Sequence, residues 1–211
     1  MTTTKNAADQ RVIDDLSALF PSPDGDADAD ADLHDLLAER ADAASLLDVA
    51  YRTIDSPIGK LLLAATPEGL VRIAFELEDH GVVLARLADE ISPRILRSPR
   101  RLDAAAAQLD EYFAGRRRQF DVPIDLQLAH GFRRTVLSHM REIAYGTTAS
   151  YTAIASAAGR PNAVRAAASA CATNPLPVIV PCHRVVRSDG LIGQYLAGPE
   201  VKQALLDMEA A

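Results

Sequence analysis

Two short alanine-rich stretches near the C-terminal end constrain the fold of this chain more than any other feature. TASYTAIASAAG (residues 148–159) and NAVRAAASACAT (residues 162–173) favour helices, because alanine has the highest helix propensity. The intervening GRP puts Gly159 and Pro161 at a tight break. We therefore predict a helix-turn-helix within a helical C-terminal lobe.

The second of these helices lacks the long polar side chains that read bases in the major groove. Arg165 is its only long cationic residue, and Ala166 and Ser169 are among the small residues that would let the backbone approach a surface closely. This composition favours sequence-tolerant binding in the minor groove with one inserted side chain. An alanine-rich helix packed in a core remains the alternative on these residues alone.

The sequence changes character at Ala50, where apolar stretches alternate with turns. AYRTID, KLLLAAT and LVRIAFE are separated by SPIG and PEG, which is typical of a small antiparallel meander. Helical patterns follow near residues 80–91 and 100–114, and VPID suggests one more strand. These patterns predict an α+β N-terminal lobe.

From about residue 129 the pattern becomes mainly helical. GFRRTVLSHMREIAYG places apolar residues on one face and ends at Gly146, a residue suited to a C-terminal cap. Residues 199–209 form a last amphipathic helix. The fold class we predict is α+β: a small antiparallel-sheet N-terminal lobe and an all-helical C-terminal lobe that carries the helix-turn-helix and Cys182.

Charge is distributed unevenly along the chain. The whole chain has a net charge of −7, yet residues 1–50 contain twelve acids and three bases, which leaves the rest net positive. Residues 116–190 hold ten arginines and four acids, an excess that could follow a phosphate backbone. The segment 21–35 is acidic and poor in large apolar residues, so we predict that it is disordered, with a short docking helix after it.

These observations divide the chain into three parts: an acidic, disordered extension (1–49), an α+β N-terminal lobe (50–125) and a domain with the helix-turn-helix and Cys182 (126–211). No apolar run approaches the roughly 20 residues that span a bilayer, and the polar start has no signal-peptide pattern. The only two cysteines, Cys171 and Cys182, form no framework for disulfides or zinc. We expect reduced thiols, a cytoplasmic location, no membrane partner and no metal site.

Cys182 and His183 stand side by side in PVIVPCHRVVRSDG, after an apolar run that looks like a strand. Nearby cations favour the nucleophilic thiolate, and His183 and Arg184 are candidates for that role. Because neighbouring residues of a strand point to opposite sides, His183 could reach the sulfur only after a bend or through a water. The carboxylates that could orient the imidazole are Glu200, Asp207 and Glu209. On spacing alone, a structural role for Cys182 is at least as well supported as a role as nucleophile.

The combined pattern is more specific. PCHRVV preceded by NPLPVIV, with the helix-turn-helix upstream and a Gly-x-Tyr segment downstream, closely resembles the O6-alkylguanine-DNA alkyltransferases. The resemblance covers roughly residues 50–211 and is strongest from 129 onward. It implies a single-turnover methylated-DNA-[protein]-cysteine S-methyltransferase, which repairs duplex DNA by direct, stoichiometric transfer of the alkyl group from O6-alkylguanine to Cys182.

The resemblance also implies roles for individual residues. Cys182 is the alkyl acceptor, His183 is the base acting through a water, and Glu209 orients the histidine. Asn174 matches the asparagine that links the helix-turn-helix to the active site. Transfer of an alkyl group to a thiolate requires no nucleotide or metal cofactor.

The remaining matches concern DNA and the flipped base. Tyr151 matches the tyrosine that helps to rotate the target nucleotide, and Arg165 matches the arginine that fills the vacated stack. The DNA-binding residues are then Tyr151, Arg165, Ala166 and Ser169, and those of the substrate pocket are Val185, Tyr195, Leu196 and Lys202. The loop GQYLAGPE departs from the small, glycine-rich family pattern, so Leu196 is expected to narrow the pocket.

Two other classes of function are alternatives to a DNA alkyltransferase. A non-catalytic relative that binds alkylated bases would lack the acceptor cysteine, which this chain retains as Cys182. A hydrolase with Cys-His catalysis would need an oxyanion hole, for which no glycine-rich donor loop is evident. The partner we expect is double-stranded DNA containing alkylated guanine, bound by a monomer. The sequence leaves open whether binding is cooperative and whether O4-alkylthymine is repaired.

Overall fold

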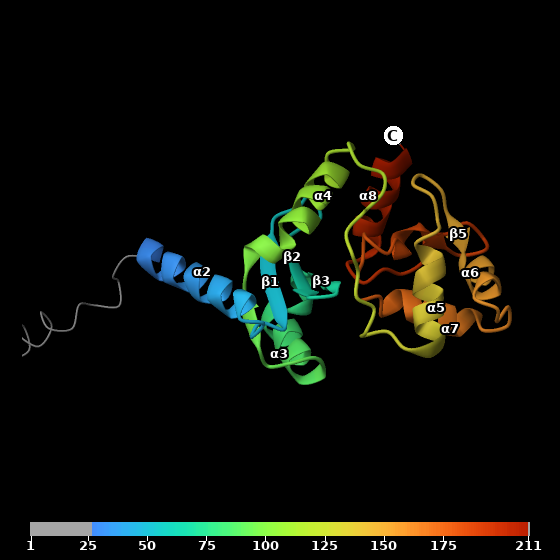
Figure 1. Ribbon diagram of the computed structural model, residues 1–211. Coiled ribbons are helices and arrows are strands. Elements are labelled where there is room, and N and C mark those ends of the chain that lie inside the picture. Colours follow the sequence, from blue (N-terminus) through green and yellow to red (C-terminus); the bar gives the residue numbers. More distant parts are fainter. Residues whose placement is uncertain (1–26, 211) are drawn as a thin grey trace, which may run out of the picture.

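The computed structural model describes residues 27–210 (Figure 1). In it the predicted meander forms three strands that lie in chain order, each antiparallel to the next. They are β1 (Val49–Ile54), β2 (Leu61–Thr66) and β3 (Gly69–Phe75). Every residue of β2 is buried. Because neighbouring side chains of a strand point to opposite faces, this burial requires both faces of the sheet to be covered.

A fourth strand, β4 (Ile95–Arg97), makes the sheet mixed, in the order β3-β2-β1-β4. It pairs parallel to β1, with Val49 opposite Ile95. This strand was not predicted, because three residues show no alternation that distinguishes a strand from a loop. The prediction of a purely antiparallel sheet is therefore wrong at this one edge.

Helices cover the two faces of the sheet, close to where the sequence predicts them. The segments are η1 (Glu76–Glu78), α3 (His80–Glu90), η2 (Pro99–Leu102) and α4 (Asp103–Phe113). Val83 and Leu87 of α3 pack on the face that carries Leu62. Leu109 of α4 packs on the face that carries Leu63.

The strand predicted through VPID does not form. The segment makes only an isolated parallel bridge between Leu70 and Ile124. Pro123 lacks the N–H that a longer ladder needs, although its carbonyl accepts from the Leu70 N–H at 2.9 Å. A side chain at Gly69 would place its Cβ 2.5 Å from that carbonyl oxygen, so this close approach requires glycine.

The C-terminal lobe contains the predicted helix-turn-helix, formed by α6 (Tyr151–Ala157) and α7 (Val164–Ala172). Around it lie α5 (Gly131–Met140), the turn η3 (Cys182–Arg184) and α8 (Pro199–Ala210). Buried residues of both lobes belong to one continuous cluster that includes Ile73 and Leu176. The Ile73 N–H also donates to the carbonyl of Pro175 at 2.8 Å, which fixes the edge strand β3 to the C-terminal lobe.

The C-terminal lobe is not entirely helical, contrary to the prediction. Two short strands, β5 (Ala149–Ser150) and β6 (Val185–Val186), pair in parallel. They were missed because two-residue strands leave no periodic signal. Their pairing brings the start of α6, and therefore Tyr151, beside the chain that follows Cys182.

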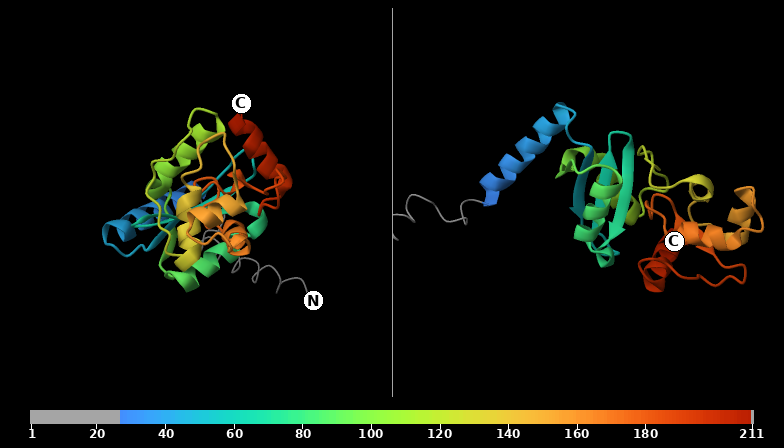
Figure 2. Two further views of the ribbon diagram at one scale, coloured as in Figure 1. Left: turned by 90° about the vertical axis from the view of Figure 1, so that its right-hand side faces the viewer. Right: turned by 90° about the horizontal axis from the view of Figure 1, so that it is seen from below.

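The segment predicted to be disordered lies partly in a helix. Residues 21–26 are outside the described residues, but 27–35 belong to α2 (Ala27–Ala43), which projects from the sheet lobe (Figures 1 and 2). Alanine favours a helix, and the C-terminal half of α2 is anchored: Ala38 is buried and Asp42 pairs with Arg101. Between residues 27 and 210, no helix has both the length and the apolarity to cross a membrane.

Candidate active site

Cys182 lies in the turn η3 and not at the end of a strand. The buried run that precedes it, residues 176–180, has the composition of a strand but contains Pro177 and a left-handed Val178 (φ 73°). Pro181 then leads into the 3-10 turn, in which the Cys182 N–H donates to the Val180 carbonyl at 2.8 Å. The prolines that interrupt this run are the reason why the strand expectation fails.

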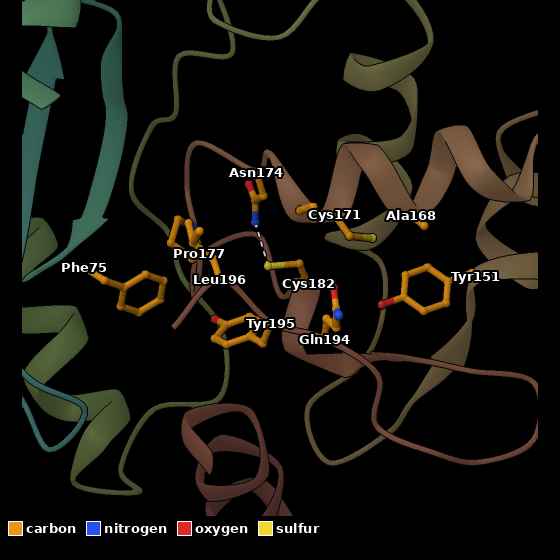
Figure 3. Close-up of a pocket in the computed structure, with 11 residues that line it drawn as sticks. Phe75, Tyr151, Ala168, Cys171, Asn174, Pro177, Cys182, Gln194, Tyr195 and Leu196 are labelled. Carbon is orange, nitrogen blue, oxygen red and sulfur yellow. Dashed lines mark hydrogen bonds between the residues drawn. The ribbon is translucent and has the colours of Figure 1, made fainter. Parts of the chain in front are cut away.

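Asn174 connects the end of the helix-turn-helix to the sulfur, as the sequence analysis expects. Its Nδ2 donates to Cys182 Sγ at 3.1 Å and to the Val180 carbonyl at 2.8 Å (Figure 3). Burial raises the pKa of the Cys182 thiol, and the Asn174 hydrogen bond only partly opposes that rise. The free protein therefore holds Cys182 as a thiol, which needs a base before it can attack.

His183 is fully buried and points its Nε2 at Glu209, 2.9 Å from Oε1. Burial lowers its pKa, and the carboxylate of Glu209 opposes this only in part, so His183 is neutral. Its other nitrogen, Nδ1, is buried and has no hydrogen-bond partner among residues 27–210. With Nε2 protonated toward Glu209, Nδ1 is the nitrogen that can accept a proton.

Glu209 is the carboxylate that reaches His183, although it is two residues from the C-terminus. Arg184 donates to both its oxygens at 2.8 Å, and Tyr112 donates to Oε1 at 2.6 Å. Burial alone would raise its pKa, but the hydrogen bonds from His183, Arg184 and Tyr112 outweigh burial and lower it. The rivals Asp207 and Glu200 are exposed, and Asp207 accepts a hydrogen bond from Gln203.

Gly146 has a role other than the helix cap that the sequence suggests. The helix α5 ends at Met140, and Gly146 (φ 72°) lies in a later turn. Its N–H donates to Glu209 Oε2 at 3.3 Å, and a Cβ at this position would lie 2.9 Å from the Glu209 carbonyl oxygen. Glycine is therefore required where the end of α8 meets this turn.

A pocket of about 360 Å³ opens in front of Cys182 (Figure 3). Tyr195 lines it and packs edge-on against Phe75 of β3, with ring centroids 5.8 Å apart. The Tyr195 hydroxyl is buried, and burial together with the nearby Cys182 raises its pKa well above the ordinary value. Leu196, which is 40 % exposed, also lines the pocket.

The pocket extends from the cysteine toward the helix-turn-helix. Tyr151, at the start of α6, lies on the side of the pocket away from Phe75 (Figure 3). Partial burial raises the pKa of its hydroxyl, which therefore stays protonated. Ala168, Cys171 and Ala172 of α7 complete this side.

Two of the predicted pocket residues do not line the pocket. Lys202 and Val185 are buried, and Lys202 Nζ donates to the Val185 carbonyl at 2.6 Å. Burial lowers the pKa of Lys202, while the Cys182 thiolate would raise it. Lys202 can therefore favour the thiolate electrostatically from behind the pocket wall.

The face of α7 that carries Arg165, Ala166 and Ser169 is exposed, whereas Ala167 and Ala170 are buried. Arg165 makes no hydrogen bond or ion pair with any residue in the range 27–210. The helix thus presents one free guanidinium and otherwise small side chains, close to the mouth of the pocket. This arrangement can place a narrow ridge against a nucleic acid and insert one side chain.

Tyr112 is the side chain in the hydrogen-bond network around Glu209 that sequence reasoning missed. It comes from α4 in the N-terminal lobe, and its side chain is fully buried. Its spacing from Leu109 and Ala105 indicates a core face, which explains why it looked like a packing residue. The available signal was its hydroxyl, because a buried tyrosine usually needs a hydrogen-bond partner.

The sequence matches two family models. The one described as "6-O-methylguanine DNA methyltransferase, DNA binding domain" covers residues 131–211, and the one described as "6-O-methylguanine DNA methyltransferase, ribonuclease-like domain" covers residues 49–126. A methylated-DNA–protein-cysteine methyltransferase from Methanosarcina barkeri is 35% identical over 159 residues, 75% of this chain and 96% of that protein. The constitutive enzyme of that name from Bacillus subtilis is 34% identical over 160 residues, 75% of this chain and 94% of its own length.

Solved structures agree with these matches. The crystal structure of Mycobacterium tuberculosis O6-methylguanine methyltransferase is 37% identical, with a TM-score of 0.68 over 77% of this chain and 93% of that chain. The Mycobacterium tuberculosis OGT in complex with DNA is also 37% identical, with a TM-score of 0.66 over 76% and 92% of the two chains.

Proposed function

The chain belongs to the 6-O-methylguanine DNA methyltransferase family, and from this premise we propose that Cys182 is the residue that accepts the alkyl group. The protein binds DNA and repairs it by transfer of an alkyl group to a cysteine. One observation carries the choice of Cys182: its sulfur faces the pocket of about 360 Å³ and accepts a hydrogen bond from Asn174.

In the proposed reaction the Cys182 proton moves to Nδ1 of His183 through a bridging water. Glu209 holds the opposite nitrogen and stabilises the imidazolium that forms. The thiolate attacks the alkyl carbon in line with the bond to O6, so that a C–S bond forms while the C–O bond breaks. Guanine leaves with the bonding electrons, and the thioether is too stable to return the thiol.

A base inside a duplex cannot reach the buried sulfur, so the target nucleotide must be flipped out. We propose that Arg165 occupies the space that the base vacates. Tyr151 and Tyr195 border the pocket on two sides, where the Tyr151 hydroxyl can donate to the guanine. The proposed substrate is therefore O6-alkylguanine in double-stranded DNA, and Leu196 at the mouth of the pocket favours small alkyl groups.

We further propose that one protomer suffices for the reaction, because the described site is built from a single chain. A reducing compartment such as the cytoplasm suits the two free cysteines, since oxidation of Cys182 would remove the acceptor.

The test is to mix the protein with duplex DNA that contains O6-methylguanine and to measure its intact mass. We expect the mass of one methyl group per chain, located on Cys182 by peptide mapping, because the product thioether cannot turn over. Cys182→Ser should gain no mass, while Cys171→Ser is the matched control and should react like the wild type. Repeated turnover, or methyl on Cys171, would contradict the proposal.

A further inference from the structure

Two of the side chains that donate to Glu209, Tyr112 and Arg184, have no part in the reaction described above. Oε1 accepts from Tyr112, from Arg184 and from His183 Nε2, at 2.6, 2.8 and 2.9 Å. The shortest of the three comes from Tyr112. Since Arg184 and His183 lie beside Cys182 in η3, Tyr112 is the one donor supplied by the N-terminal lobe.

Tyr112 is held rigidly in this position. Its side chain is fully buried, and its ring packs against Phe113, Phe120 and Tyr145 with centroids 5.4, 5.2 and 6.2 Å away. Burial and the adjacent Glu209 carboxylate raise the pKa of its hydroxyl far above the ordinary value. The hydroxyl therefore stays protonated and donates a hydrogen bond to Glu209.

Charged groups on α8 and on η3 itself also face His183. Glu209 and Lys202 come from α8, and Arg184 comes from η3. The two cations disfavour a charged imidazole, whereas Glu209 favours it. The Tyr112 hydroxyl, 3.5 Å from Nε2 of His183, draws charge from the same oxygen to which His183 donates, and so weakens the one group that favours the imidazolium.

We propose that Tyr112 is a positioning residue, whose hydroxyl orients the Glu209 carboxylate and withdraws charge from Oε1 so that His183 remains neutral and able to accept the Cys182 proton. This inference rests on the proposed function. It gives the N-terminal lobe a part in the chemistry, because α4 supplies the hydroxyl that completes the shell around Glu209.

The experiment is the pH profile of single-turnover methyl transfer for Tyr112→Phe, followed by intact mass. The variant keeps the ring and its packing, while Arg184 and His183 still satisfy Oε1, so we expect it to fold. Without the hydroxyl, Glu209 holds a protonated His183 more strongly and the pKa of His183 rises. Because only neutral His183 accepts a proton, the acidic limb of the pH–rate profile should move to higher pH by about half to one unit. A shift of this size corresponds to the free energy of one lost hydrogen bond.

Tyr145→Phe is the matched control. Tyr145 belongs to the same aromatic cluster and donates to α8, but its acceptor is the Met208 carbonyl at 3.3 Å and not Glu209. It should leave the limb where it is in the wild type. Replacement of Tyr112 by 3-fluorotyrosine, whose hydroxyl is a stronger donor, should move the acidic limb to lower pH.

Unchanged limbs in both Tyr112 variants, or an equal shift in Tyr145→Phe, would overturn the inference. A wild type that gains no methyl on Cys182 would overturn the proposed function instead, so the two failures can be told apart.

Discussion

Glu209→Ala is expected to lower the free energy of unfolding by about 3–5 kcal/mol and to abolish methyl transfer. The Glu209 side chain is 1% exposed and the Arg184 side chain 7%, so the substitution leaves a buried guanidinium without its carboxylate. His183 and Tyr112 lose the same acceptor. Chemical denaturation and intact mass after incubation with methylated duplex measure the two effects.

Asp207→Ala serves as the control, because it removes an exposed carboxylate from the same helix. It should change stability by no more than about 0.5 kcal/mol and leave the transfer intact. Equal effects of the two substitutions would show that α8 tolerates neither change for reasons unrelated to the ion pair.

Glu209 also predicts a pH dependence of stability. Its pKa is lowered in the folded protein, so its contribution is fully present above the ordinary carboxyl pKa of about 4.3 and is lost as the pH falls below that value. Glu209→Gln, measured where it remains folded by circular dichroism, should lack this part of the acid-induced loss of stability.

Arg165→Ala is expected to slow repair of duplex DNA by at least about tenfold, while its reaction with free O6-methylguanine base stays within about twofold of the wild type. Arg165 is the long cationic side chain on the exposed face of α7, and it makes no hydrogen bond or ion pair with any residue between 27 and 210. A free base needs no extrusion from a stack, so only the duplex reaction should depend on this side chain. Single-turnover rates on both substrates measure the difference.

Arg134→Ala controls for general loss of positive charge, because Arg134 is exposed on α5 outside the helix-turn-helix. It should weaken duplex binding slightly, in a salt-dependent way, without a selective loss of the transfer rate. Equal slowing of the duplex and free-base reactions by Arg165→Ala would rule out the role in flipping.

Local patterns in the sequence were sufficient to predict several elements. The alanine-rich stretches around Gly159 and Pro161 predicted α6 and α7, because propensity and a turn break act over a few residues. Apolar stretches separated by the turns SPIG and PEG predicted β1 to β3 for the same reason. The strand β4 and the pair β5–β6 could not be predicted, since two or three residues show no period and these strands depend on partners far away in the chain.

The functional site shows the same difference between residues found from local sequence patterns and residues found only from the tertiary structure. The residues near Cys182 in the chain, His183 and Asn174, were identified from the motif and its family resemblance. Spacing alone offered three carboxylates for His183, and the family resemblance selected Glu209 among them. The packing of α8 against the turn at Gly146 is what buries Glu209 beside the imidazole. Tyr112 lies 71 residues from His183, and nothing local indicates that its hydroxyl reaches the same carboxylate. The sequence therefore identifies which residues have suitable chemistry, but the packing of the two lobes around one core sets the distances between side chains on different helices and turns.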